Sequence, residues 1–199
     1  METKKMKNAA NFFSSLAKFG KTFALVMACV CGVFAILLLI FGKGMVSNFY
    51  LELGDLSIYF KDNHSFNENL MITQTAVELF ISVLICLAVS YACKTLYEVI
   101  EPMKEGRPFE ESTAKGLKKL AWTSLVVGGL GEIINLVESI FTGVIFNFEE
   151  LFGSLSWVDS VVYEYEMDLS FIFIFCIFMF LSHVFQYGQK LQQESDETL

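Results

Sequence analysis

Proline is nearly absent from this sequence of 199 residues, which contains only 2. Disordered and collagen-like chains are rich in proline, so both classes are excluded. Charge is also scarce: 18% of the residues are charged, and acidic residues outnumber basic ones by 22 to 14. The net charge of −8 is unlike that of a nucleic-acid-binding domain, so we expect no direct contact with nucleic acid.

Signatures of catalysis are absent as well. The sequence contains no GxSxG elbow, HExxH zinc motif, Walker loop or dinucleotide-binding glycine pattern. The five cysteines all fall in apolar stretches, and no pair has the spacing and histidine company of a zinc site. We therefore expect a protein that is not an enzyme, with no catalytic residues, no cofactor and no metal site. We interpret the cysteines as small packing residues.

The chain is instead rich in hydrophobic residues, at 54%, and has a mean hydropathy of +0.53. Four stretches approach or exceed the roughly 20 residues that a helix needs to cross a bilayer. They are residues 22–42, 75–99, 120–146 and 169–188. The last alternates phenylalanine and isoleucine like a strand, but an isolated strand in lipid would leave its backbone groups unsatisfied. The sequence thus predicts an all-α integral membrane protein, a four-transmembrane-helix bundle forming a single domain, 1–199.

Basic residues set the expected orientation of the four spans. Twelve of the 14 Lys and Arg lie in the N-terminal segment, in the connection between the second and third spans counted from Lys94 near the end of the second span, or in the C-terminal tail. Only Lys43 and Lys61 lie in the other connections. Because basic residues concentrate on the cytoplasmic side, we expect both termini and loop 100–119 to be cytoplasmic. Loops 43–74 and 147–168 are then external.

The external loops contain short segments in which apolar and polar residues alternate, as is typical of strands. Two such segments within residues 49–60 flank Gly54-Asp55, a pair typical of hairpin turns. A third segment lies at residues 161–167. We predict a small extracellular β-hairpin or cap built from loops one and three.

The third span carries polar residues on one helical face. At about 100° per residue, Glu132, Asn135 and Glu138 fall in one arc together with glycines, and apolar residues fill the opposite arc. On the second span, Glu78 shares a polar side with Ser90, Cys93 and Tyr97. We therefore predict that these two faces pack against each other, with Glu132 near the bilayer midplane. A carboxylate at that depth is a functional-site hypothesis; the alternative is a protonated or hydrogen-bonded group that fixes the packing of the bundle.

Two further motifs lie in the expected cytoplasmic regions. The connection contains the sequence GRPF, and the chain ends VFQYGQKLQQESDETL. These motifs resemble the bacterial four-span membrane family called domain of unknown function 2975, over nearly the whole chain. The matching positions are Gly106, Pro108, Phe109, Val184, Phe185, Gly188, Leu191, Gln192, Glu194, Asp196, Thr198 and Leu199.

The resemblance implies a multi-pass protein of the bacterial plasma membrane without an established activity. Members of that family are often encoded beside a small helix-turn-helix regulator of the Xre type, which implies a cytoplasmic partner. The resemblance would then give a partner-binding role to Gly106, Pro108, Phe109, Gly188, Leu191, Gln192, Glu194, Asp196 and Thr198.

Three functions stay open at this point. The first is a non-enzymatic regulatory or sensor protein that holds the regulator at the membrane. The second is a small oligomeric transporter, linked to protons or cations through Glu132. The third is an accessory subunit that packs on another membrane protein. Membrane lipid is an expected partner in each case, and the sequence leaves the oligomeric state open.

Overall fold

The computed structural model describes residues 2–42, 50–53, 56–59, 68–105, 109–146 and 167–197. Within these residues the helices are α1 (Glu2–Phe41), α2 (Glu68–Lys104), α3 (Glu111–Phe146) and α5 (Ser170–Glu197), and the strands are β1 (Tyr50–Leu53) and β2 (Leu56–Tyr59). All four of these helices are long and apolar enough to cross a membrane. The chain is a multi-pass, predominantly helical membrane protein, as the four apolar stretches predict.

The helices are longer than the predicted spans. Because α2 runs to Lys104 and α3 begins at Glu111, most of the expected loop 100–119 is helical. Polar residues outside the apolar stretches support these extensions through pairs one turn apart, such as Lys115 with Glu111 at 2.6 Å. The helices extend beyond the predicted spans because hydropathy marks only the part of a helix that lipid covers.

Strands β1 and β2 pair antiparallel in the first long connection. Tyr50 lies opposite Tyr59, and Leu53 lies opposite Leu56. This is the place at which the alternating segments predict a hairpin. The predicted turn residues 54–55 and the predicted third strand at 161–167 lie largely or wholly outside the described residues.

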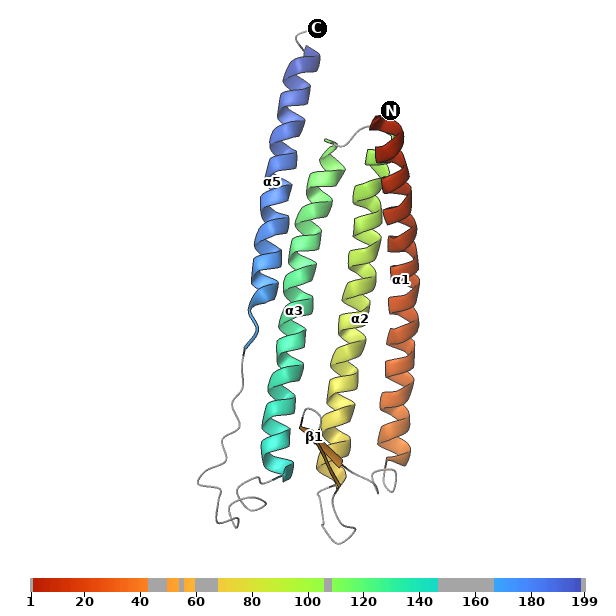
Figure 1. Cartoon of the computed structure of the whole chain (residues 1–199), viewed down its shortest axis with the longest axis vertical. Helices are drawn as coiled ribbons and strands as arrows, with labels where there is room; N and C mark the ends of the chain where they lie inside the picture. Colours follow the sequence, from red (N-terminus) through yellow and green to blue (C-terminus); the bar gives the residue numbers. More distant parts are fainter. Residues whose placement is uncertain are drawn as a thin grey trace. The chain divides into compact units, whose positions relative to one another are not determined.

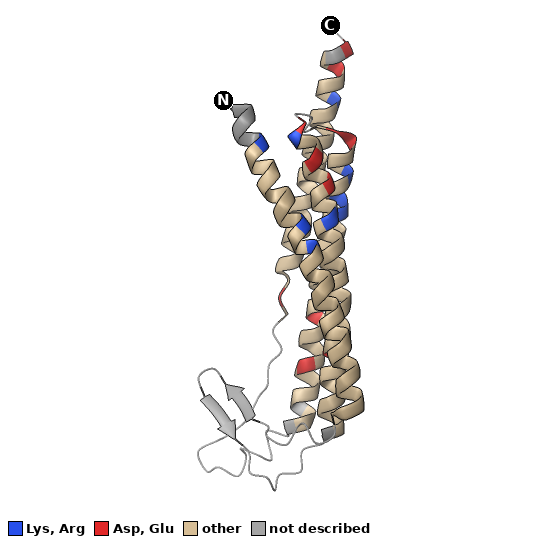
Figure 2. Ribbon diagram, turned by 90° about the vertical axis from the view of Figure 1, so that its right-hand side faces the viewer, with Lys and Arg blue, Asp and Glu red and all other residues tan. Residues whose placement is uncertain are grey.

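The chain divides into two compact units, and α1, α2 and α3 each contribute to both. The first unit contains Met1–Cys29, Val83–Glu132 and Met167–Leu199, and the second contains Val30–Ser82 and Ile133–Glu166. Within the first unit, α2 lies between α1 and α3, and α5 lies on the other side of α3 (Figure 1). Every Lys in the described helices belongs to this unit, where the basic residues gather toward one end (Figure 2).

The core of the first unit joins three helices. Val99 of α2 and Leu117 and Leu120 of α3 are buried together, and α5 covers them with Phe178, Leu181 and Phe185. Close approach depends on small residues: a Cβ atom at Gly116 would collide with the Val99 side chain. The predicted pairing of the second and third spans is therefore present, with α5 as a third member.

Helix α1 packs through a row of small residues. Its buried positions in the first unit are Ala10, Ser14, Ala17, Ala24 and Ala28. Their spacing of three, four or seven residues keeps them on one side of the helix, while large residues such as Phe19 and Phe23 are exposed. Small side chains let two helix backbones approach closely, so this row forms the contact side of α1.

The second unit is described more sparsely. Ile72 and Ile81 of α2 are buried there, as is Ala35 of α1. Helix α1 ends where the Gly42 N–H donates to the Leu38 carbonyl at 2.8 Å. A side chain at Gly42 would press on Ile72, so the end of α1 also lies against α2 in this unit.

Helix α5 begins at a side-chain cap. The Ser170 N–H and hydroxyl donate to the two carboxylate oxygens of Asp168, at 2.8 and 3.0 Å. These hydrogen bonds hold the pKa of Asp168 below its usual value of 3.8. An aspartate that accepts from the first N–H groups fixes the start of the helix.

Candidate functional site

The two motifs that carry the family resemblance meet each other in the first unit. Phe109 is the first described residue after position 105, and the centre of its ring lies 5.5 Å from that of Phe185 on α5. A Cβ atom at Gly188 would lie 2.6 Å from the Phe109 ring. Glycine at position 188 therefore makes room for Phe109. We call this contact of Phe109, Phe185 and Gly188 the Phe109 clasp.

The clasp continues the packing of α5 against α3. One turn before Phe185, the buried Ser182 hydroxyl donates to the Ala114 carbonyl of α3 at 2.8 Å. Phe185 itself also covers the three-helix core. The clasp thus ties the short connection before α3 to α5, and it fixes where the last part of α5 leaves the bundle.

Helix α5 continues beyond the clasp to Glu197. Leu191, Gln192 and Glu194 are exposed there. Leu191 is 48% exposed, and it follows Tyr187, which is 66% exposed, and Val184 at spacings of four and seven residues. These three apolar side chains share one side of the helix, because residues three, four and seven apart lie on one face. We call Val184, Tyr187 and Leu191 the α5 stripe.

The motif residues therefore fall into two groups. Phe109 and Gly188 contact each other, whereas Leu191, Gln192 and Glu194 lie on the extension of α5 past that contact. Gly106, Pro108, Thr198 and Leu199 lie outside the described residues, as does the side chain of Asp196.

The polar arc of α3 is only partly covered. Glu132 is half-buried, but Asn135 and Glu138 are exposed. In the second unit, Glu138 lies close enough to Glu78 for their charges to repel. The Gln74 side-chain amide donates to Glu78 at 2.8 Å. Glu138 thus lies near a residue of α2 while staying exposed, and the packing of this arc against the second span stays a prediction.

The predicted polar side of α2 faces α1 in the first unit, not α3. The Ser90 hydroxyl donates to the Lys21 carbonyl at 3.3 Å, and a Cβ atom at Gly20 would lie 3.0 Å from Cys93 Sγ. Lys18 lies 4.7 Å above the Tyr97 ring. The expectation that these residues face α3 was wrong, because α2 meets α3 through another side that includes Thr95 and Val99.

Sequence reasoning missed the row of small residues on α1 and a polar contact at its basic end. The Lys104 ammonium group donates to the Ser14 hydroxyl at 2.6 Å, and Ser14 is almost fully buried. The available signal was the repeat of alanine and serine at heptad-like spacing. The cysteines, expected as packing residues, are all free, and Cys29 and Cys176 among them are exposed.

The cysteines and carboxylates bring no metal-binding cluster together in the part of the chain that is described. Comparisons with curated proteins and with solved structures give no match. A family model described as "Protein of unknown function (DUF2975)" matches residues 69–199, from α2 through the clasp to the C-terminus. The match leaves out α1 and the hairpin, although the resemblance was expected over nearly the whole chain. Both resembling motifs lie inside the matched range, and the chain belongs to the DUF2975 family.

Proposed function

We propose that this protein is a non-enzymatic membrane partner that holds a small helix-turn-helix transcription regulator of the Xre type at the cytoplasmic face. The observation that carries the proposal is the extension of α5. The α5 stripe starts beside the Phe109 clasp, where Tyr187 is 66% exposed, and continues onto this extension with Leu191, which is 48% exposed. An amphipathic helix with apolar anchors at such spacings is a common way for one protein to occupy the groove of another.

The clasp gives the extension a defined starting direction. Because Phe109 is seated over Gly188, the turn of α5 that carries Tyr187 and Leu191 is anchored at its root. A pre-positioned helix loses less conformational entropy on binding than a free tail. In this proposal the clasp positions the extension, and the exposed residues after it contact the regulator.

The proposal places both termini in the cytoplasm of a bacterial cell and the hairpin outside the plasma membrane. The distribution of lysine supports this orientation: every Lys in the described helices belongs to the first unit, which also contains both ends of the chain. The β1–β2 hairpin is then a candidate external sensor. Alkaline phosphatase, which is active only outside the cytoplasm, should be inactive when fused after Leu199. It should be active when inserted between residues 147 and 168. The reverse pattern would overturn the orientation.

The partner is tested by capture from the native host. The full chain carries an affinity tag at its N-terminus, is extracted in mild detergent, and its bound proteins are identified by mass spectrometry. We expect a small helix-turn-helix protein to bind the full chain. A chain that ends at Lys190 should lose it, because this truncation removes Leu191 and the polar residues after it while keeping the clasp.

Point variants separate docking from folding. Leu191→Ser should weaken capture without lowering thermal stability, since the Leu191 side chain is exposed. Gln193→Ser, on another side of the same exposed turn, is the matched control and should bind normally. Capture of the same regulator by the full chain and by the chain ending at Lys190, with unchanged transcription of its target genes, would refute the proposal.

A further inference from the structure

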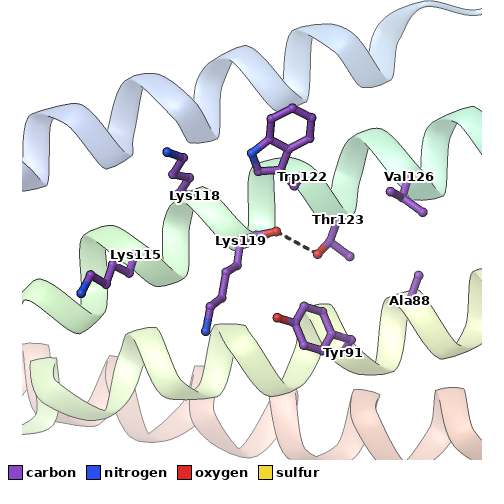
Figure 3. A pocket seen from close by; sticks show the side chains of 8 residues that line it. All are labelled: Ala88, Tyr91, Lys115, Lys118, Lys119, Trp122, Thr123 and Val126. Atoms are coloured by element: carbon purple, nitrogen blue, oxygen red, sulfur yellow. Dashed lines mark hydrogen bonds between the residues drawn. The ribbon is translucent and has the colours of Figure 1, made fainter.

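A groove opens between α2 and α3 on the surface of the first unit. It has a volume of about 570 Å³, within the range typical of small-molecule sites. Its walls include Ala88, Tyr91, Trp122, Val126, Lys118 and Lys119 (Figure 3). Trp122, Val126 and Tyr91 are each about half exposed, so the groove faces the surroundings of the helices and is not filled by the chain itself.

The groove has a basic end and an apolar end. Lys118 and Lys119 precede Trp122 by one turn of α3, and Val126 follows it by another, so charge gives way to apolar surface along the helix. In Figure 3 the side chain of Lys119 extends toward α2 and that of Lys118 toward α5. The lysines therefore flank the groove at the end where α3 enters the membrane.

Neighbouring polar groups are accounted for within the chain. Lys115, at the same basic end, pairs with Glu111 at 2.6 Å. The Thr123 hydroxyl donates to the carbonyl of Lys119 at 2.8 Å. The charge offered to a ligand therefore comes from Lys118 and Lys119, and the remaining wall is apolar or aromatic.

We propose that this groove is a binding site for one anionic phospholipid. The anionic headgroup lies at the basic end of the groove, which Lys118 and Lys119 flank from its two sides, and one acyl chain lies along Trp122, Val126 and Ala88. Charge complementarity selects an anionic headgroup, and basic sites between transmembrane helices bind such headgroups at the cytoplasmic leaflet. A free phosphate would leave the apolar length of the groove empty, so the chemistry commits to a lipid. The assignment to the inner leaflet rests on the orientation proposed above.

Trp122 is a built-in reporter for the acyl chain. The chain has 2 tryptophans, so Trp157→Phe leaves Trp122 as the only one. This protein is reconstituted in phosphatidylcholine vesicles, and its fluorescence is followed as brominated phosphatidylglycerol or brominated phosphatidylcholine is added. Bromine quenches tryptophan only on contact. We expect the phosphatidylglycerol to reach half-maximal quenching at a mole fraction roughly twenty-five times lower, since each of the two lysines contributes about a factor of five near a membrane surface.

Three variants test the parts of the site. Lys118→Gln with Lys119→Gln should abolish the preference for phosphatidylglycerol. The matched control, Lys94→Gln with Lys190→Gln, removes the same charge from α2 and α5 outside the groove and should keep the preference. Ala88→Leu fills the apolar end without changing charge and should reduce the preference.

Four outcomes would contradict the proposed lipid site. Equal quenching by the two lipids in the unmodified groove would mean ordinary boundary lipid and would overturn the site. If the preference for phosphatidylglycerol survives the change of Lys118 and Lys119, the proposed headgroup contact is refuted. If the preference is unchanged by Ala88→Leu, the proposed acyl-chain contact is refuted. Competition by inorganic phosphate alone would also overturn the lipid assignment. The chain ending at Lys190 should keep the preference, so a failure of the regulator proposal is distinguishable from a failure of this one.

Discussion

Helix α3 contains two stretches of contrasting character, divided between the two units after Glu132. In the first stretch Thr113, Ala114 and Ala121 are almost fully inaccessible. In the second, no residue from 133 to 145 whose side chain is described is buried, and Asn135 and Glu138 are exposed. The contrast shows that small residues mark the contacts of this helix, whereas carboxylates do not. Lipid is as apolar as leucine, so close backbone approach decides where such helices pack.

Two adjacent glycines on α3 give the largest expected difference in stability. A Cβ atom at Gly128 would collide with the root of the Phe171 side chain of α5, while a Cβ atom at Gly129 would meet nothing within 4 Å. Gly128→Ala should therefore destabilise the protein by about 1–3 kcal/mol through overpacking. Gly129→Ala should leave it unchanged or stabilise it by about 0.5–1 kcal/mol through helix propensity.

Both variants are compared by reversible unfolding in detergent micelles, with fluorescence as the signal. A stability loss that is equal at the two positions would contradict the idea that α3 makes a close contact at Gly128 and none at Gly129.

Hydroxyl groups that form hydrogen bonds between helices give the next largest expected effect on stability. Ser182 of α5 donates to the Ala114 carbonyl of α3 at 2.8 Å, whereas Ser124 donates to Ala121 of its own helix at 2.7 Å. Ser182→Ala should cost about 0.6 kcal/mol and at most about 1.7 kcal/mol, the mean and the largest value for hydrogen bonds between membrane helices. Ser124→Ala is the control and should be close to neutral in the same unfolding experiment. If the two serines contribute equally, the contact between α3 and α5 does not depend on the Ser182 hydrogen bond.

A substitution in the exposed stretch of α3 should change the stability of the protein only slightly. Glu138→Gln removes a charge that repels Glu78, in an exposed side chain. We expect the free energy of unfolding to change by less than about 0.5 kcal/mol, with any change upward. A loss of more than twice that amount would mean that the carboxylate holds the fold, as one interpretation of the sequence had it.

These contrasts also explain what could be predicted from sequence. The spans were predictable because length and hydropathy are local properties, as in the run from 169 to 188. The rotation of each helix about its axis was not predictable. Ser90 and Cys93 of α2 were predicted to face α3 on polarity alone, yet they contact α1. The motif residues Phe109 and Gly188 were identified through resemblance, but their mutual contact depends on how α5 returns past α3. Sequence patterns do not contain that information.

The smallest expected effect lies at Asp168, a fully exposed side chain just before the start of α5. Hydrogen bonds from Ser170 lower the pKa of Asp168 in the folded protein, so the ionised cap stabilises the helix above the unfolded-state value of 3.8. This contribution should be lost as the pH falls below 3.8 through the lowered pKa of the folded state. Asp168→Asn should therefore lower the melting temperature slightly at neutral pH, and the difference from the unmodified protein should shrink at acidic pH. Because Asp168 is fully exposed, the difference should remain smaller than that caused by Gly128→Ala at every pH. A larger effect would mean that the fold depends on the entry into α5 as well as on the small-residue contacts within the bundle.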